Sequence, residues 1–190
     1  HGREDRLSTP VRFSDNARAI LRSNPLESYL DIEAVIQAAK TMGVDAVHPG
    51  YGFLAENADF VKRLEEEGIT FIGPSSDVIR LLGDKIEARK AMEAAGLPVA
   101  KGSSEPVSTT EEATSLAEEI GYPVIIKAAA GGGGIGMQIV HEASEFPSAL
   151  NLCQSRARSA FGDDRVFVEK YIQGAQHIEF QVLADGEKAI

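Results

Sequence analysis

The sequence contains a single cysteine, Cys153, so no disulfide can form within the chain. Small secreted domains usually depend on disulfides, whereas a lone cysteine fits a protein of the reducing cytoplasm. Cys153 lies in a helical pattern, which favours a buried small hydrophobic side chain over a nucleophile. We therefore expect a cytoplasmic protein whose thiol has no catalytic role.

Long apolar runs, a signal peptide and an excess of positive charge are also missing. The first two absences argue against a membrane protein or a secreted one. The 19 Lys and Arg residues against 29 Asp and Glu residues give a net charge of -10. This acidity argues against nucleic-acid or membrane partners. Any anionic ligand must then be held by locally placed lysines and backbone dipoles.

The 190 residues are enough for one full domain or two small ones. With 43% hydrophobic and 25% charged residues, the composition is that of an ordinary globular protein. The chain starts at His1 without a methionine and stops at Ile190 in strand-like sequence. We expect it to be a fragment of a longer protein.

The most unusual stretch is a loop of glycines between two apolar strands, which we expect at residues 124–127 and 137–140. Each glycine fixed in a loop costs about 0.5 to 1 kcal/mol relative to alanine, and a hairpin turn needs only one or two. Gly131 to Gly134 and Gly136 exceed that need. A row of N–H groups without Cβ atoms can cradle phosphate oxygens. The alternative is a surface flap that binds nothing.

Two well-known phosphate loops do not fit this stretch. The spacing of Gly131, Gly133 and Gly136 matches the dinucleotide fingerprint, but that motif opens a helix and β-like sequence follows here. A P-loop needs Lys and then Ser or Thr after its last glycine, where Met137 and Gln138 stand. The sequence instead predicts a hairpin that closes over a nucleotide from one side.

The first half of the chain predicts a parallel pair of strands. Apolar residues at helical spacing occupy residues 32–39 and 60–64, and each set is followed by a strand, at 44–47 and 69–72. Strand, helix and strand at this spacing imply a right-handed crossover. Ligands gather at the carboxyl ends of such strands. Tyr51 and Gly52 lie in the loop after the first strand, where a tight turn with a packed tyrosine is the alternative.

Helix ends give further expectations. Lys85 begins a predicted helix, where the positive end of the helix dipole disfavours a cation unless a phosphate binds there. Thr109 and Glu112 form a capping box, and Ser144 is the expected N-cap of a helix over residues 144–160.

Two further strands are expected near the end of the chain. Glu169 and Lys170 interrupt an apolar run at residues 166–172. Residues 177–183 alternate, with His177 and Glu179 on one face. A solvated sheet face is the alternative to a binding role.

Together these motifs resemble the biotin carboxylase family, the ATP-grasp component of acetyl-CoA, propionyl-CoA and pyruvate carboxylases. The resemblance runs from about Tyr29 to Ile190 and is carried in order by residues 48–57, 71–74, 83–85, 122–127, the glycine loop, 169–171 and 177–179. It implies an α/β fold of the α+β ATP-grasp type. The implied domains are a partial N-terminal parallel α/β domain at 1–72, a helical linker at 73–99, a flap (lid) domain with antiparallel strands and a glycine-rich hairpin at 100–172, and the first strands of a central domain at 173–190.

The resemblance implies an ATP-dependent ligase that activates bicarbonate as carboxyphosphate and carboxylates biotin on a carrier protein. This is the first half-reaction of an acyl-CoA or pyruvate carboxylase. The implied cofactors are ATP and Mg²⁺, with biotin as the carrier-bound substrate. The implied partners are a biotin carboxyl carrier domain and a carboxyltransferase subunit or domain, and a homodimer is left open. Another ATP-grasp ligase, such as carbamoyl phosphate synthetase, and a non-catalytic nucleotide-binding fragment are the alternatives.

The resemblance also implies roles for particular residues. Lys85 and Lys127 would bind the phosphates, beneath Gly133 and Gly134. The adenine would be held by Glu169, Lys170, Tyr171 and Ile172, and the ribose and phosphate side would be approached by His177. Tyr51 and Gly52 would face bicarbonate and biotin.

The sequence departs from the family pattern in three respects. Residues 1–24 do not follow that pattern closely, and the family's opening strand and first glycine turn are missing upstream. Ile135 stands where the family usually has Arg or Lys, which removes an ionic contact in the flap. The family's Mg²⁺-binding glutamates and catalytic arginine would lie beyond Ile190. No catalytic or metal-ligating residue is therefore assigned within the chain, and we expect the fragment alone to be inactive.

Overall fold

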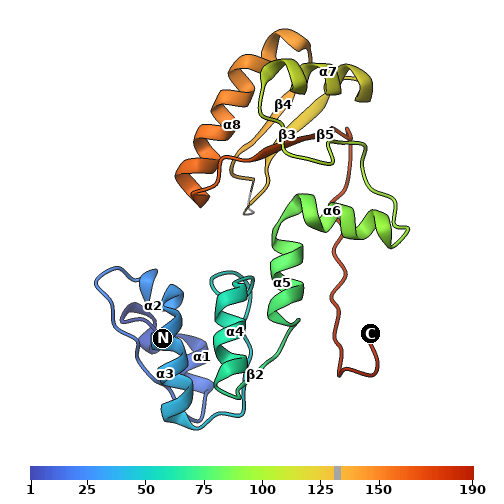
Figure 1. Ribbon diagram of the computed structural model, residues 1–190. Helices are drawn as coiled ribbons and strands as arrows, with labels where there is room; N and C mark the ends of the chain where they lie inside the picture. The colour runs from blue at the N-terminus through green and yellow to red at the C-terminus, as the bar shows by residue number, and fades with distance from the viewer. Residues whose placement is uncertain (131–133) are drawn as a thin grey trace. The chain divides into compact units, whose positions relative to one another are not determined.

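The computed structural model describes residues 1–130 and 134–190, which form two compact units. Unit 1 is His1–Leu97 and unit 2 is Pro98–Ile190. Figure 1 shows the order of the elements along the chain. Unit 1 contains η1 (Glu4–Leu7), α1 (Thr9–Phe13), α2 (Glu27–Leu30), α3 (Ile32–Met42), β1 (Ala46–Val47), α4 (Ala58–Glu66), β2 (Thr70–Phe71), α5 (Ser76–Gly83) and α6 (Lys85–Ala94). Unit 2 contains α7 (Thr110–Ile120), β3 (Val124–Ala128), β4 (Met137–Val140), η2 (Ala143–Glu145), α8 (Phe146–Phe161) and β5 (Val166–Lys170).

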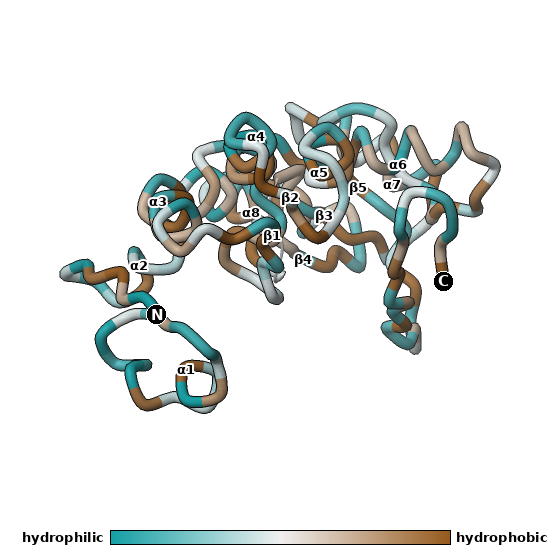
Figure 2. Tube along the Cα trace, turned by 90° about the horizontal axis from the view of Figure 1, so that it is seen from below, coloured by the Kyte–Doolittle hydropathy of each residue, from teal (hydrophilic) through white to brown (hydrophobic). Residues whose placement is uncertain are grey.

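Unit 1 is built around the predicted strand, helix and strand. β1 and β2 pair in parallel, with Ala46 opposite Thr70, which confirms the parallel pair with α4 as its crossover. α3 and α4 each alternate between hydrophobic and hydrophilic stretches in Figure 2, as expected for helices that bury one side. The buried sides meet in one cluster with the strands, composed of Ile36, Ala39, Leu54, Phe60, Leu64 and Ile69.

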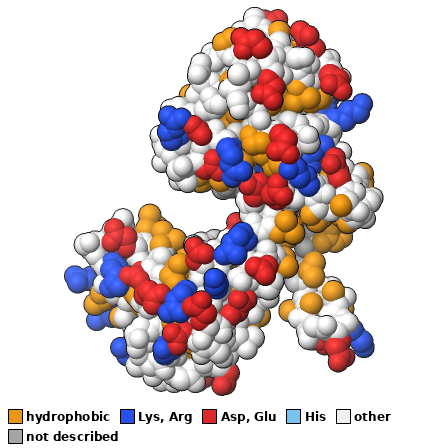
Figure 3. Space-filling model, viewed as in Figure 1, with side chains coloured by type: hydrophobic (Ala, Val, Ile, Leu, Met, Phe, Trp, Pro, Cys, Tyr) orange, Lys and Arg blue, Asp and Glu red, His pale blue; other side chains and the backbone are white. Residues whose placement is uncertain are grey.

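Surface ion pairs also join α3 to α4. The guanidinium of Arg63 on α4 contacts the carboxylate of Glu33 on α3 at 2.9 Å, and it also contacts Glu66 of its own helix at 2.8 Å. Hydrogen bonding to Arg63 lowers the pKa of Glu33. Figure 3 shows acidic and basic side chains interspersed on the visible face of unit 1. On this face, positive and negative side chains therefore partly compensate one another.

Helix α6 begins at Lys85, as predicted, but its first turn is already capped. The carboxylate of Asp84 accepts hydrogen bonds from the backbone N–H groups of Ile86 at 2.9 Å and Glu87 at 3.2 Å. An aspartate at the N-cap supplies the negative charge that the helix dipole favours. The Asp84 carboxylate already neutralises the positive end of the α6 dipole. The position of Lys85 at the helix start therefore no longer indicates a phosphate there.

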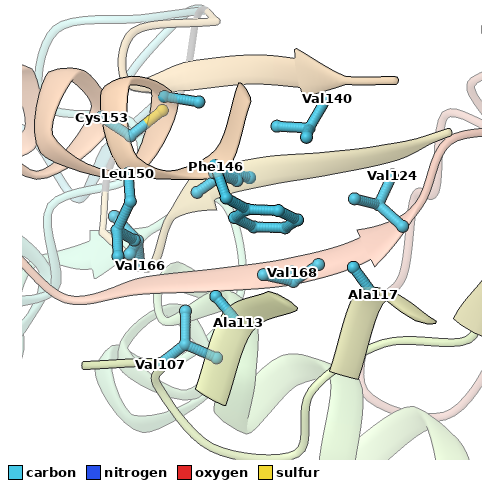
Figure 4. Packing of buried hydrophobic residues seen from close by; sticks show 12 residues of the cluster. Val107, Ala113, Ala117, Val124, Val140, Phe146, Leu150, Cys153, Val166 and Val168 are labelled. Atoms are coloured by element: carbon cyan, nitrogen blue, oxygen red, sulfur yellow. The ribbon is translucent and has the colours of Figure 1, made fainter. Parts of the chain in front are cut away.

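Unit 2 is a three-stranded antiparallel sheet covered on one side by two helices. The strand order is β4-β3-β5, and β3 and β4 form the predicted glycine-linked hairpin. Helix α8 contacts all three strands, while α7 contacts β5 and α8. Figure 4 shows the ring of Phe146 in the middle of this core, with Cys153 and Leu150 further along α8. The predicted antiparallel strands joined by a glycine-rich hairpin are confirmed.

The predicted N-cap at Ser144 is wrong. The short helix η2 contains Ser144, and α8 begins only at Phe146, without a side-chain cap from Glu145. The Ser144 hydroxyl donates to the Glu142 carboxylate instead. Phe146 is completely buried, and Pro147 suits the first turn of a helix because it needs no N–H partner. Packing and proline therefore fix the helix start.

The prediction of a strand over residues 177–183 is also not matched. In the described chain this segment has no regular secondary structure and no partner strand, and only its end pairs, through reciprocal 2.9 Å hydrogen bonds between Leu183 and Ile190. Its apolar side chains Ile178 and Phe180 are exposed. A strand is assigned only where its backbone groups find a neighbour. Among the described helices, none is both long and apolar enough to cross a membrane.

Candidate functional site

Two of the predicted site residues, Lys127 and Glu169, lie on the side of the unit 2 sheet that faces away from α7 and α8. The strand register places Lys127 opposite Met137 and Phe167. Directly opposed side chains in a sheet project from the same face. We call this set the outer face: Ile125, Lys127, Met137, Ile139, Phe167 and Glu169. The contribution of Met137 and Ile139 was missed from the sequence because it depends on the register.

Lys127 and Glu169 form an ion pair on the outer face. The Nζ of Lys127 donates to Oε2 of Glu169 at 2.6 Å, and the two side chains are 28% and 15% exposed. A charge-assisted hydrogen bond in a partly buried place is stronger than one in water. An ammonium has three N–H donors, so one bond to Glu169 does not exhaust its capacity to bind an anion.

Glu169 is held from its other side by the segment that contains Gly102. The backbone N–H of Ser103 donates to the carbonyl of Val168 at 2.8 Å, and Lys170 donates to the carbonyl of Lys101 at 2.7 Å. A Cβ atom on Gly102 would lie 2.7 Å from the Val168 oxygen and 2.9 Å from Cγ of Glu169. Gly102 therefore makes room for the Glu169 side chain. Nothing in the sequence around this single glycine indicated that role.

Lys170, predicted to help hold adenine, has backbone partners within unit 2. Its Nζ donates to the carbonyl oxygens of Gly121 at 2.8 Å and Tyr122 at 3.0 Å. Gly121 is the C-cap of α7, where a cation interacts favourably with the helix dipole. The next residue, Tyr171, donates its N–H to the carbonyl of Pro123 at 3.1 Å. These contacts fasten the end of β5 to the turn between α7 and β3.

The glycine hairpin is described in part. Gly133 lies outside the described residues, whereas Gly134 is exposed, with φ +80°. Gly136 has φ +73°, and a Cβ atom there would lie 3.1 Å from Cβ of Ala128. The carbonyl of Gly136 accepts the N–H of Ala128 at 2.9 Å, which closes the hairpin. Backbone geometry and close packing therefore require glycine at position 136 without any ligand.

The remaining residues predicted in unit 2 are exposed. His177 contacts Glu179 at 3.0 Å, and the two side chains are 83% and 79% exposed. This contact is consistent with the predicted common face, although such exposed pairs add little stability. Ile172, directly after β5, is also exposed, and so is Ile135 in the hairpin.

Tyr51 and Gly52 lie in the turn after β1 in unit 1. The backbone N–H of Gly50 donates to Nδ1 of His48 at 3.0 Å. The ring of Phe53 packs against Tyr29, with centroids 5.1 Å apart, although Phe53 is 54% exposed, whereas Tyr51 is 83% exposed. Phe53 has φ +48°, an uncommon conformation for a bulky residue. The alternative of a packed tyrosine is therefore wrong, since Phe53 packs and Tyr51 points to solvent.

Unit 1 also contains an open hollow of about 730 Å³, lined by Val11, Ile20, Tyr29 and Met42 among others. Neither Tyr51 nor Gly52 lines it. No group of three His, Cys, Asp or Glu side chains within the described residues is arranged to hold a metal ion. On the outer face of unit 2, Lys127 places a cation beside the apolar side chains of Met137 and Phe167.

Two family models match the chain in succession. Residues 1–79 match the model described as biotin carboxylase, N-terminal domain. Residues 84–190 match the model described as carbamoyl-phosphate synthase L chain, ATP binding domain.

Curated relatives match most of the chain. A biotin carboxylase of Pseudomonas aeruginosa is 47% identical over 188 residues, which is 98% of this chain and 42% of the relative. A pyruvate carboxylase of Bacillus subtilis is 52% identical over 161 residues, which is 85% of this chain and 14% of the relative. The chain thus spans only 42% and 14% of the length of these two relatives.

Solved structures agree with the relatives. A complex of biotin carboxylase with β-γ-ATP from Campylobacter jejuni has a TM-score of 0.87 at 43% identity, covering 91% of this chain and 39% of that one. The biotin carboxylase domain dimer of the Hydrogenobacter thermophilus 2-oxoglutarate carboxylase, with MgADP, ADP and bicarbonate, has a TM-score of 0.86 at 42% identity, covering 91% and 38%. The resemblance found in the motifs is therefore confirmed, and the chain belongs to the biotin carboxylase family, with an α/β fold of the ATP-grasp type.

Proposed function

We propose that the chain is the nucleotide-binding front part of an enzyme that carboxylates biotin on a carrier protein. The reaction would use ATP and bicarbonate, pass through carboxyphosphate, and form the first half-reaction of an acyl-CoA or pyruvate carboxylase. The observation that carries the proposal is Lys127, at the end of the strand that enters the glycine hairpin, in a chain aligned over 98% of its length with a biotin carboxylase.

The outer face of unit 2 has the chemistry that ATP needs. Ile125, Met137 and Ile139 offer apolar surface for a base, and Lys127 offers positive charge beside it. A lysine about 4 Å from a phosphate charge gains roughly 4 kcal/mol at an effective dielectric constant near 20. That gain offsets the repulsion of an anion by a chain of net charge -10.

The other residue roles are part of the same proposal. Lys127 binds phosphate, and Lys85 of unit 1 binds phosphate as well. Gly133 and Gly134 cover the phosphates, and His177 contacts the ribose and phosphate side. Residues 169–172 hold the adenine, partly through main-chain groups, while Tyr51 and Gly52 serve bicarbonate and biotin.

We place the Mg²⁺ ligands, and the residues that act on carboxyphosphate, in parts of the protein that the longer relatives contain. Mg²⁺ would neutralise charge on the phosphates when bound. The proposed partners are a biotin carboxyl carrier domain and a carboxyltransferase, and a homodimer is supported by the dimer named for the Hydrogenobacter thermophilus relative. The proposed division at residues 72, 99 and 172 places the glycine hairpin in the lid domain.

A carbamoyl phosphate synthetase is the second candidate, because the model that matches residues 84–190 carries that name. Residues 1–79 favour biotin carboxylase, since they match its N-terminal domain and contain the loop at positions 48–57. The two enzymes differ in one requirement that is easily measured, since only the first needs biotin.

The test is phosphate release from ATP by the full-length protein that contains this chain. We expect release to require bicarbonate and to be stimulated by free biotin, with little release when either is left out. A reaction without bicarbonate serves as the control for contaminating ATPases. Bicarbonate-dependent release that ignores biotin and responds to an ammonia donor would favour the synthetase. Release that is independent of both co-substrates would overturn the proposal.

A further inference from the structure

We propose that Glu169 is a positioning residue for Lys127. Its carboxylate holds the lysine ammonium at the outer face of the lid in the orientation that receives phosphate. This inference rests on the proposed function and adds a side-chain role for Glu169 that differs from holding adenine. The contact itself is the 2.6 Å hydrogen bond from Nζ of Lys127 to Oε2 of Glu169.

The geometry suits such a role because both ends of the pair are anchored in one sheet. Lys127 on β3 stands opposite Phe167 on β5, and Glu169 is two residues further along the same strand. This diagonal arrangement lets long side chains meet across neighbouring strands. A lysine side chain otherwise has many rotamers to lose when it binds a ligand. The ion pair selects one place for the ammonium before any ligand arrives.

Glu169 is itself more restrained than an ordinary surface glutamate. Its side chain is 15% exposed, and Gly102 stands so close that a Cβ atom would lie 2.9 Å from Cγ of Glu169. Strand β5 is paired with β3 on one edge and with residues 101–103 on the other. The carboxylate is therefore carried by a strand supported on both sides, which makes it a suitable fixed point.

A carboxylate near a phosphate site has two opposing effects. It repels the incoming phosphate, and it pre-organises the cation that attracts it. In protein kinases, an ion pair between the phosphate-binding lysine and a glutamate must be in place for activity, so positioning prevails there. The same balance is expected here, because an ammonium has three donors and can contact the Glu169 carboxylate and a bound phosphate at once. We therefore expect removal of Glu169 to weaken ATP binding.

The experiment measures the Kd for ATP by calorimetry with the full-length protein and four variants. Lys127→Gln tests the lysine, and Glu169→Ala removes the carboxylate. Glu169→Asp keeps the charge but is one methylene too short, whereas Glu169→Gln keeps an acceptor oxygen at the same reach. We expect Glu169→Ala and Glu169→Asp to raise Kd about tenfold, the size of a charge-assisted hydrogen bond, and Glu169→Gln to raise it less.

A matched control removes a different ion pair of unit 2. Arg158 and Asp164 are paired on the surface, with side chains 73% and 43% exposed. Asp164→Asn should leave the Kd for ATP unchanged. A spectroscopic readout, the NMR signal of the Lys127 ammonium in nucleotide-free protein, should show slow proton exchange that Glu169→Ala abolishes. Loss of fold alone would instead disturb all amide signals, in which case Glu169→Gln and Glu169→Asp decide the question.

The outcomes separate this inference from the proposed function. If Lys127→Gln leaves the Kd for ATP unchanged, the proposed phosphate role of Lys127 fails. If Lys127→Gln weakens binding but Glu169→Ala and Glu169→Asp do not, only the positioning role fails. Tighter ATP binding by Glu169→Ala would show that the carboxylate competes with phosphate, and would also overturn the inference.

Discussion

At the scale of single residues, Lys127 is the side chain on which the proposed binding site most depends. We expect Lys127→Gln to lower the affinity of the full-length protein for ATP at least about tenfold, or about 1.4 kcal/mol, because it removes a positive charge beside the phosphates. Lys62→Gln, which changes an exposed lysine on α4, is the control and should have no effect. Calorimetric titration with ATP measures both, and equal affinities would remove Lys127 from the site.

Gly102 illustrates a glycine required by a close approach of the backbone. In Gly102→Ala the new Cβ would lie 2.7 Å from the carbonyl oxygen of Val168, so the edge of β5 must shift. We expect a loss of stability of about 1 to 3 kcal/mol, typical of overpacking. Gly83→Ala is the matched control, because nothing lies within 4 Å of its added Cβ and alanine favours the end of α5. Thermal unfolding that ranks the two variants equally would contradict this account.

Cys153 gives a prediction about pH. The thiol is buried in the unit 2 core, and desolvation raises its pKa to about 11. A thiol in the unfolded chain ionises at its ordinary pKa of about 8.5. The contribution of the protonated Cys153 thiol to the free energy of unfolding is therefore complete below that pH. It is lost as the pH rises towards 11. Alkylation of Cys153 in the native protein at pH 8 should be slow. Above pH 9 the free energy of unfolding should fall with pH less steeply for Cys153→Ala than for the unmodified protein. Rapid alkylation at pH 8 would show that the thiol is accessible.

At the scale of elements, the start of α7 carries a side-chain cap that can be tested. Oγ1 of Thr109 accepts the N–H of Glu112 at 3.2 Å, and the Glu112 carboxylate accepts the N–H of Ser108 at 3.0 Å. Thr109→Ala should cost about 1 kcal/mol of stability, because it leaves a helix N–H without its partner. Ser115→Ala, at an exposed position within the same helix, should be neutral or slightly stabilising. Urea unfolding of both variants measures the difference.

The two helix starts of unit 2 show how far a local pattern can be trusted. Thr109 was predicted as a cap and is one, because α7 begins directly after it, at Thr110, and the Thr109 side chain accepts the N–H of Glu112. Ser144 has the same chemistry but lies inside η2, since burial of Phe146 decides where α8 begins. A capping residue is thus a reliable indicator only when no large apolar side chain nearby dictates a different start.

At the scale of the whole molecule, unit 2 contains its own core. The cluster around Phe146 draws all of its buried members from residues between Val107 and Val168. A polypeptide of residues 98–190 should therefore fold alone, with a cooperative thermal transition and native-like helix content by circular dichroism. Residues 1–97 expressed separately provide the comparison. A gradual, non-cooperative transition for residues 98–190 would show that unit 2 depends on the rest of the chain.

The sequence by itself determined the family, the parallel pair in unit 1 and the glycine hairpin in unit 2. These features depend on local patterns, namely apolar periodicity, turn residues and glycine content, which neighbours in the chain largely specify. Only the tertiary structure decided that Lys127 meets Glu169, that Gly102 makes room for Glu169, and that Lys170 binds the carbonyls of Gly121 and Tyr122. Each of these contacts joins residues at least 42 positions apart, as the pairs from Lys127 to Glu169 and Lys170 to Gly121 show. Strand register and packing decide which of these distant residues come into contact, and neither can be read from the order of residues.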